Sequence, residues 1–129
     1  AGLDAGQSYN TWPKMGETFI PEGLFFAEEK FMGIFDNSIF IHFFHRSLAY
    51  LCIAIILIIS ILHFKKIKYV VQKIHFISII SLVIIQVVIG IYVVLSNVQI
   101  SLGSIHQIVG SLLFALTFSY FLLLNRRKI

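Results

Sequence analysis

Two histidines, His45 and His106, lie inside long apolar runs, each a turn or two from the start of its run. An ionisable side chain is costly inside a membrane-spanning segment and is therefore a functional candidate by default. If both runs cross a membrane in the same direction, the two imidazoles reach the same depth. Two such imidazoles facing each other across a helical bundle can supply both axial ligands of a heme. Histidines in proton relays and quinone sites have similar positions, so the spacing leaves those functions open.

Small residues follow each histidine at helical spacing. Ala49 lies four positions after the first histidine and Gly110 four positions after the second, so each shares a helix face with its histidine. Small side chains leave room for a flat ring, although close helix packing in a membrane uses the same pattern. Gln86 and Gly90 repeat the spacing in the middle apolar run. They are expected either to line the same cavity or to form an interhelical hydrogen bond.

Other basic residues near these runs have separate interpretations. Arg46 follows His45 at the outer edge of its run, where a guanidinium suits a heme propionate or a lipid phosphate. His42 shares the face of His45, so spacing alone does not exclude it as the ligand, although its place at the helix mouth makes it the weaker candidate. His63 and His75 flank a lysine-rich link and are interpreted as interfacial side chains.

The elements that carry these residues are predicted to be transmembrane helices. The chain has 129 residues, of which 58% are hydrophobic and 12% charged, and its mean hydropathy of +0.91 indicates lipid as the solvent. Residues 39–62, 76–96 and 104–124 are each long enough to cross a bilayer and contain no proline. Because backbone groups in lipid must be satisfied internally, all three are predicted to be helices.

Charge predicts the orientation of the chain. All six acidic residues lie within residues 1–38, whereas basic clusters follow the first and third apolar runs. The positive-inside rule places those clusters in the cytoplasm and residues 1–38 in an extracytoplasmic loop. Within this loop, residues 22–33 are amphipathic enough for a short interfacial helix, with an irregular loop as the alternative. Residues 39–129 are then the helical bundle.

Composition also excludes some functions. The basic residues sit mainly at the ends of apolar runs rather than on a polar face, which argues against nucleic-acid binding. Cys52 is the only cysteine, so no disulfide can form within the chain. The opening residue is Ala1 rather than methionine. Together with the count of three helices, this suggests a piece of a longer protein.

Three segments resemble a known family. The opening loop AGLDAGQSYNTWPKMGETFIPEGL, the segment FFHRSLAY of the first span and the segment SIHQIVGSLLF of the third are similar to the second half of heme A synthases of the alphaproteobacterial and mitochondrial type. The resemblance covers essentially the whole chain. It implies an all-α integral membrane protein, in which these three spans are part of a four-helix heme-binding bundle that lacks its first helix.

The resemblance also implies roles for particular residues. His45 and His106 take the places of the two axial ligands of heme b, with Arg46 and Gln107 as their motif neighbours. Residues of the matched loop are expected to cap the heme pocket, although the tryptophan among them suits an ordinary interfacial anchor equally well. These loop residues are Asp4, Tyr9, Asn10, Trp12 and Pro13. No residue here is a strong candidate for the catalytic acid or base, and the resemblance implies that the catalytic residues lie in the missing N-terminal half.

The implied activity is the oxidation of the C8 methyl group of heme O to the formyl group of heme A, for cytochrome oxidase. Heme O would be the substrate, and heme O synthase and an electron acceptor are the implied partners besides the lipid bilayer. The segment alone is expected to be inactive, and homo-oligomerisation is left open. The expected location is the bacterial inner membrane, with the mitochondrial inner membrane as the alternative. The rival functions are a cytochrome b electron-transfer module, or a small transporter or assembly subunit with proton-relay histidines.

Overall fold

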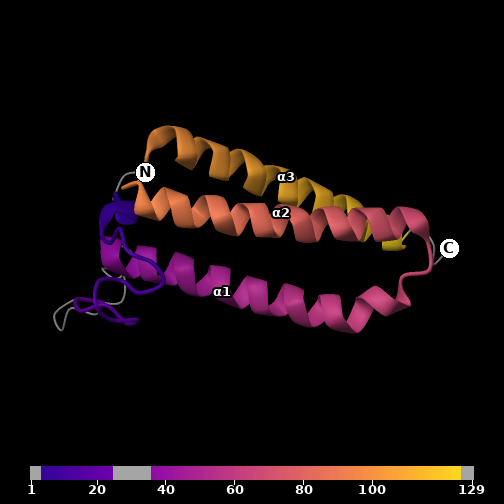
Figure 1. The fold of residues 1–129 in the computed structure, drawn as a ribbon, viewed down its shortest axis with the longest axis horizontal. Coiled ribbons are helices and arrows are strands. Elements are labelled where there is room, and N and C mark those ends of the chain that lie inside the picture. Colours follow the sequence, from indigo (N-terminus) through magenta and orange to yellow (C-terminus); the bar gives the residue numbers. More distant parts are fainter. Residues whose placement is uncertain (1–3, 25–35, 126–129) are drawn as a thin grey trace.

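The structure is a computed structural model that describes residues 4–24 and 36–125. These residues form helices and connecting turns, with no β-strand among them (Figure 1). In chain order the elements are η1 (Ala5–Gln7), α1 (Ser38–His63), η3 (Phe64–Lys66), α2 (Val70–Leu95) and α3 (Ile100–Asn125). The predicted all-α class is confirmed. The interfacial helix expected near residues 22–33 falls mainly outside the described residues and stays a prediction.

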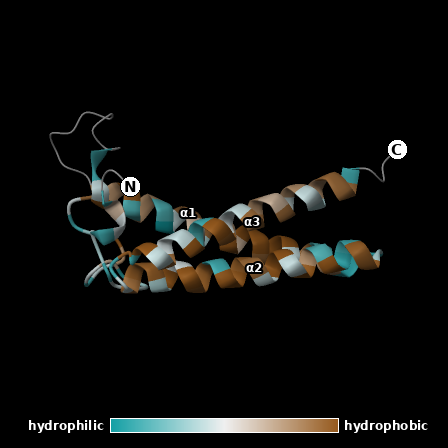
Figure 2. Cartoon of the chain, turned by 90° about the horizontal axis from the view of Figure 1, so that it is seen from above, coloured by the Kyte–Doolittle hydropathy of each residue, from teal (hydrophilic) through white to brown (hydrophobic). Residues whose placement is uncertain are grey.

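Three helices are long and apolar enough to cross a membrane, as the sequence predicted. They are Ser38–Lys66, Val70–Leu95 and Ile100–Asn125. The first and third extend beyond their predicted apolar runs at both ends, whereas the second begins at Val70, before its run, and ends at Leu95, one residue short of it. Polar residues can occupy the terminal turns of a helix outside the hydrocarbon. Most of their apolar side chains are exposed, and hydrophobic residues dominate all three helices (Figure 2). In lipid the exposure of apolar side chains has no free-energy cost. The three helices are therefore those of a multi-pass membrane protein.

The three helices are not equally close. α2 and α3 pack side by side along their length, whereas α1 stands apart from this pair (Figure 1). Phe76 and Ile79 of α2 and Tyr120 of α3 form the buried cluster between the paired helices. The Phe76 ring lies 6.1 Å from that of Phe64, which closes the gap to α1 at the lysine-rich end. At the other end, α1 contacts the opening loop, and this loop in turn contacts the link between α2 and α3.

Asn37 fixes the start of α1. Its side-chain oxygen accepts hydrogen bonds from the backbone N–H groups of Ile39 and Phe40, at 2.9 and 3.2 Å. Its amide nitrogen donates to the backbone oxygen of Gly23 at 3.0 Å. The buried asparagine is thus both an N-cap and a link between α1 and the opening loop.

The opening loop also contacts the link between α2 and α3. Val98 in this link has a φ of 59°, a conformation that is costly for a β-branched residue. Its N–H donates to the Val93 oxygen at 2.8 Å, which holds the turn. Its side chain lies against Gly6, where a Cβ atom would approach Val98 Cγ2 to 2.8 Å. Only glycine at position 6 allows the loop to lie this close to the link.

Candidate functional site

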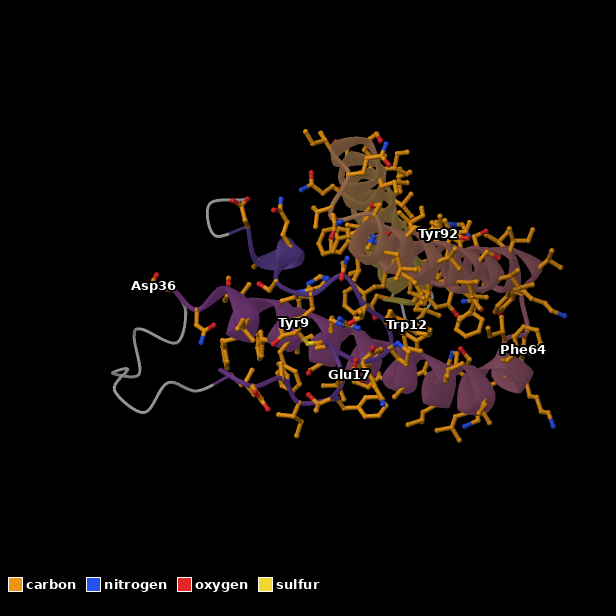
Figure 3. All side chains as sticks on the ribbon, turned by 60° about the vertical axis from the view of Figure 1, so that its left-hand side comes forward. Tyr9, Trp12, Glu17, Asp36, Phe64 and Tyr92 are labelled. Atoms are coloured by element: carbon orange, nitrogen blue, oxygen red, sulfur yellow. The ribbon has the colours of Figure 1, made fainter. Side chains whose placement is uncertain are left out.

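A cavity of about 370 Å³ lies between α1 and the α2–α3 pair. Side chains from the opening loop and from all three helices line it, and most of them are apolar. Its polar lining is concentrated toward the loop end of the helices. Trp12 projects from the loop near this region and contributes to the lining (Figure 3). We call this space the inter-helix cavity.

Helix α1 places His42, His45, Arg46 and Ala49 on the inter-helix cavity. His42 is 4% exposed, and its Nδ1 atom is enclosed without a hydrogen-bond partner among the described residues. His45 is exposed and lines the cavity one turn further along. The shared face that the sequence predicted is therefore present, with His42 the more deeply enclosed of the two.

His106 reaches the inter-helix cavity from α3 and contacts Gln86 of α2. The Gln86 amide nitrogen lies 3.1 Å from the backbone oxygen of His106 and 3.2 Å from its ring Nε2 atom. The carbonyl can only accept, which fixes the amide group as the donor in both contacts. Nε2 is therefore the acceptor, and the ring proton resides on Nδ1.

Two atoms of this pair remain unsatisfied. The Nδ1 atom of His106 is buried without a hydrogen-bond partner among the described residues. The Oε1 atom of Gln86 is likewise buried without a hydrogen-bond partner among the described residues. Burying an unpaired polar group costs about 1–3 kcal/mol. The side chains of Gln86 and His106 thus leave one donor and one acceptor unmatched.

Two glycines allow Gln86 and His106 to interlock. A Cβ atom at Gly90, one turn after Gln86, would lie 3.0 Å from Cε1 of the His106 ring. A Cβ atom at Gly110, one turn after His106, would lie 3.1 Å from the Gln86 amide nitrogen. Each side chain therefore rests on the glycine of the opposite helix. Gly110 serves this helix packing, which was one of the two interpretations of the small-residue pattern, and Gly90 also lines the inter-helix cavity.

Arg46 ties α1 to the opening loop. Its guanidinium donates to the backbone oxygens of Thr11 at 3.1 Å, Pro13 at 2.9 Å and Lys14 at 3.3 Å. The side chain is 7% exposed and also lines the inter-helix cavity. The sequence suggested a heme propionate or a lipid phosphate as the partner of this guanidinium. The partners in the structure are instead these three backbone oxygens. The main described role of Arg46 is to hold the loop over the cavity.

Several residues singled out from the sequence lie elsewhere. Gln107, the motif neighbour of His106, is exposed and faces away from the inter-helix cavity, in a shallow surface depression on α3. Of the five loop residues expected to cap the site, only Trp12 lines the cavity. His63 and His75 do not line it, and their interpretation as interfacial residues stays a prediction. Gly6 and Val98 do line it, although no pattern in the sequence singles out either residue.

The lining suits a flat apolar ligand that carries its own metal. Among the described residues, the lining includes three imidazoles and one guanidinium but no carboxylate. Within residues 4–24 and 36–125, no group of three histidine, cysteine or acidic residues could hold a metal ion. Two histidine ligands with no such group among the described residues fit a metal that brings its own ring of ligands, as in a porphyrin. The apolar walls fit the faces of such a ring, and Arg46 supplies a positive charge for an anionic edge.

The chain is similar to known proteins over most of its length. The family model described as cytochrome oxidase assembly protein matches residues 1–118. Heme A synthase of Pelagibacter ubique is 36% identical over 99% of the chain and 36% of its own length. Heme A synthase of Wolbachia pipientis is 35% identical over 99% of the chain and 34% of its own length, and that of Bartonella henselae is 36% identical over 85% and 31%.

The chain therefore spans about a third of the length of these curated relatives. No solved structure matches it significantly. The family match extends from the opening loop through most of α3, so it includes every residue that lines the inter-helix cavity. On this match, the chain belongs to the cytochrome oxidase assembly protein family.

Proposed function

We propose that this chain is the heme b-binding segment of a heme A synthase, with His45 and His106 as the axial ligands of the iron. The observation that carries the proposal is the shared position of the two histidines. One comes from α1 and the other from α3, and both line the inter-helix cavity.

The residues of the chain have distinct roles in this proposal. His45 and His106 hold the iron, and the apolar side chains of α1 and α2 exclude water from the ring faces. Arg46 holds the opening loop in place, and those of its N–H groups that do not bind the loop are available to a propionate. A bound heme b supplies one-electron redox chemistry at this position.

The proposed activity of the complete protein is heme A synthesis. In this reaction the C8 methyl group of heme O becomes a formyl group, four electrons pass to an acceptor, and water supplies the oxygen atom. The catalytic residues belong to the part of the protein outside this chain. Heme O synthase is the proposed source of the substrate, and the bacterial inner membrane is the proposed location, with residues 1–38 on its outer side.

A difference spectrum tests the site assignment. We expect the protein purified from its complete gene to show a low-spin b-type signal when the reduced and oxidised spectra are subtracted. His45→Ala and His106→Ala should each abolish this signal. His63→Ala and His75→Ala are matched controls that should leave it unchanged. A normal spectrum in both ligand variants would remove the assignment, and loss of the signal only in His42→Ala would move one ligand to that residue.

A second measurement separates the synthase from a cytochrome b electron-transfer module, which would use the same histidines. Membranes that contain the complete protein and heme O should accumulate heme A, detected by chromatography and mass. A chain that binds heme b but forms no heme A under these conditions would instead be an electron-transfer module. Absence of any heme absorbance would favour a transporter or assembly subunit.

A further inference from the structure

We propose that His42 and Arg46 form a carboxylate subsite at the loop end of the inter-helix cavity, and that His42 selects a ligand that carries this group. The inference rests on the proposed heme-binding function, in which the carboxylate is a propionate of the porphyrin. Its basis in the structure is that both side chains are buried and line the cavity, and that the described part of the lining contains no carboxylate.

The first step of the argument concerns the charge of Arg46, which is 7% exposed. Its hydrogen bonds within the described residues all go to backbone oxygens, which carry no net charge. A buried charge is costly unless an opposite charge pairs with it. The group that would balance the guanidinium at this position is therefore an anion in the inter-helix cavity.

The second step concerns the donors that Arg46 leaves for such an anion. The loop occupies the two terminal nitrogens, because Nη1 donates to Thr11 while Nη2 donates to Pro13 and Lys14. The Nε–H group has no partner among the described residues, yet it is not fully enclosed. It is thus accessible on a side chain that lines the inter-helix cavity. Arg46 can bind the loop and an anion at the same time.

The third step concerns His42, which lies one helical turn before Arg46 on the same face of α1. Neither ring nitrogen of His42 has a hydrogen-bond partner among the described residues, and Nδ1 is fully enclosed whereas Nε2 is not. A buried N–H without an acceptor is rarer than a buried acceptor without a donor, so the ring proton belongs on Nε2. His42 thereby offers a donor at the accessible edge of its ring, on the inter-helix cavity.

The fourth step is the position of the subsite relative to the proposed iron ligand on α1. His42 lies three residues before His45, which is about 4.5 Å along the helix axis toward the opening loop. The iron of a heme lies at the centre of the porphyrin, whereas the propionates project from its rim. A donor one turn away from the iron ligand is therefore placed for the rim of the ring.

The fifth step identifies the ligand group as a carboxylate. Its two oxygens can accept from the Nε–H of Arg46 and the Nε2–H of His42 together, and its charge balances the guanidinium. Hydrogen bonds to an ionised acceptor are stronger than those to a neutral one. An ester keeps a carbonyl oxygen but loses the charge, so the subsite should favour the free acid over the ester.

The test compares the affinities for ferric heme b and for its dimethyl ester. The protein is purified from its complete gene, prepared without heme, and titrated while the low-spin signal that His106→Ala abolishes is followed. Other heme sites of the protein then do not contribute. We expect His42→Phe to bind the free acid about 10-fold more weakly than the wild type, with a change below about twofold for the ester, because only the acid loses a hydrogen bond to a charged group.

His42→Gln is the conservative variant, since its amide nitrogen takes the place of Nε2 and can still donate. It should restore most of the affinity for the free acid, whereas the shorter amide of His42→Asn should not. His63→Phe is the matched control, because His63 does not line the inter-helix cavity. Both affinities should be unchanged in this control.

Equal weakening of acid and ester binding in His42→Phe, no weakening of either, or no rescue by His42→Gln would overturn the inference while the heme site stands. Loss of the low-spin signal from His42→Gln in excess heme would overturn it too, because His42 would then be an iron ligand. If the wild-type protein and His106→Ala have identical spectra, the proposed function itself fails.

Discussion

The imidazole of His106 lies directly against the backbone of Gly90, on the neighbouring helix. A Cβ atom at Gly90 would stand 3.0 Å from the ring atom Cε1 and 3.5 Å from Nδ1. The smallest side chain would already press on the ring, and a larger one would have to displace it. The orientation of the proposed iron ligand on α3 thus depends on a residue of α2 that has no side chain.

Gly90→Leu should therefore weaken heme binding. The leucine side chain would push the His106 ring out of its place beside Gln86, and we expect binding weaker by roughly 10-fold or more, the scale seen when a metal ligand loses its orientation. The measurement is the ratio of heme to protein in the purified sample. Gly103→Leu is the control, because a Cβ atom there meets nothing within 4 Å. Equal loss in both variants would show that the effect is general to glycine replacement.

Arg46→Met should loosen the opening loop. The substitution removes the guanidinium hydrogen bonds to the oxygens of Thr11, Pro13 and Lys14. Losing hydrogen bonds from a buried charged group costs roughly 2–3 kcal/mol. Local opening should then speed hydrogen exchange at the Met15 amide by roughly 100-fold, measured by mass spectrometry.

Lys14→Met is the control for this experiment, since the Lys14 side chain is exposed and Arg46 contacts only its backbone. Exchange at Met15 should be unchanged in this variant. If Arg46→Met leaves the exchange rate unchanged as well, the loop is held by other contacts. In that case the guanidinium is free to act at the inter-helix cavity.

The sequence was sufficient to predict the helices and the face on which the histidines lie. Long apolar runs without proline have one stable form in lipid, and helical periodicity then brings His42, His45 and Ala49 onto one face. The pairing of Gln86 with α3 was one of two alternatives that spacing allowed. The structure shows that Gln86 does both, because it lines the inter-helix cavity and bonds to His106.

The contacts of the loop were beyond reach of the sequence. Arg46 donates hydrogen bonds to backbone oxygens that are 32 to 35 residues earlier in the chain. Every residue has a backbone oxygen, so the pattern of side chains does not indicate which of these oxygens will accept. The contact of Gly6 with Val98 depends on a left-handed residue in the link, which a valine gives no reason to expect. Helical periodicity and hydropathy describe single helices. They do not predict the distance between α1 and the α2–α3 pair, because this distance depends on packing between elements.

Asn37→Ala should destabilise the start of α1. It removes the oxygen that accepts from the Ile39 and Phe40 amides and the nitrogen that donates to Gly23. Loss of an N-cap costs about 1 kcal/mol, and loss of the link to the loop adds to this. Thermal unfolding in detergent, followed by circular dichroism, should show a lower midpoint.

Asn37→Asp separates these two contributions, because a carboxylate still caps the helix but cannot donate to Gly23. Its unfolding midpoint should lie between those of the wild type and Asn37→Ala. Asn10→Ala is the matched control at an exposed position of the loop. A midpoint for Asn37→Asp equal to that of Asn37→Ala would mean that the link to the loop carries the whole effect.

Tyr120→Phe should leave the protein as stable as before, or raise its stability by about 1 kcal/mol. The Tyr120 hydroxyl is buried without a hydrogen-bond partner among the described residues, so its removal relieves a desolvation cost. The ring itself packs on Phe76, with centroids 6.1 Å apart, and Tyr120→Ala should therefore cost about 3–5 kcal/mol. Unfolding in detergent measures both, with Tyr92→Phe as the control at an exposed position. If Tyr120→Phe instead lowers stability, the hydroxyl has a partner in a part of the protein outside the described residues.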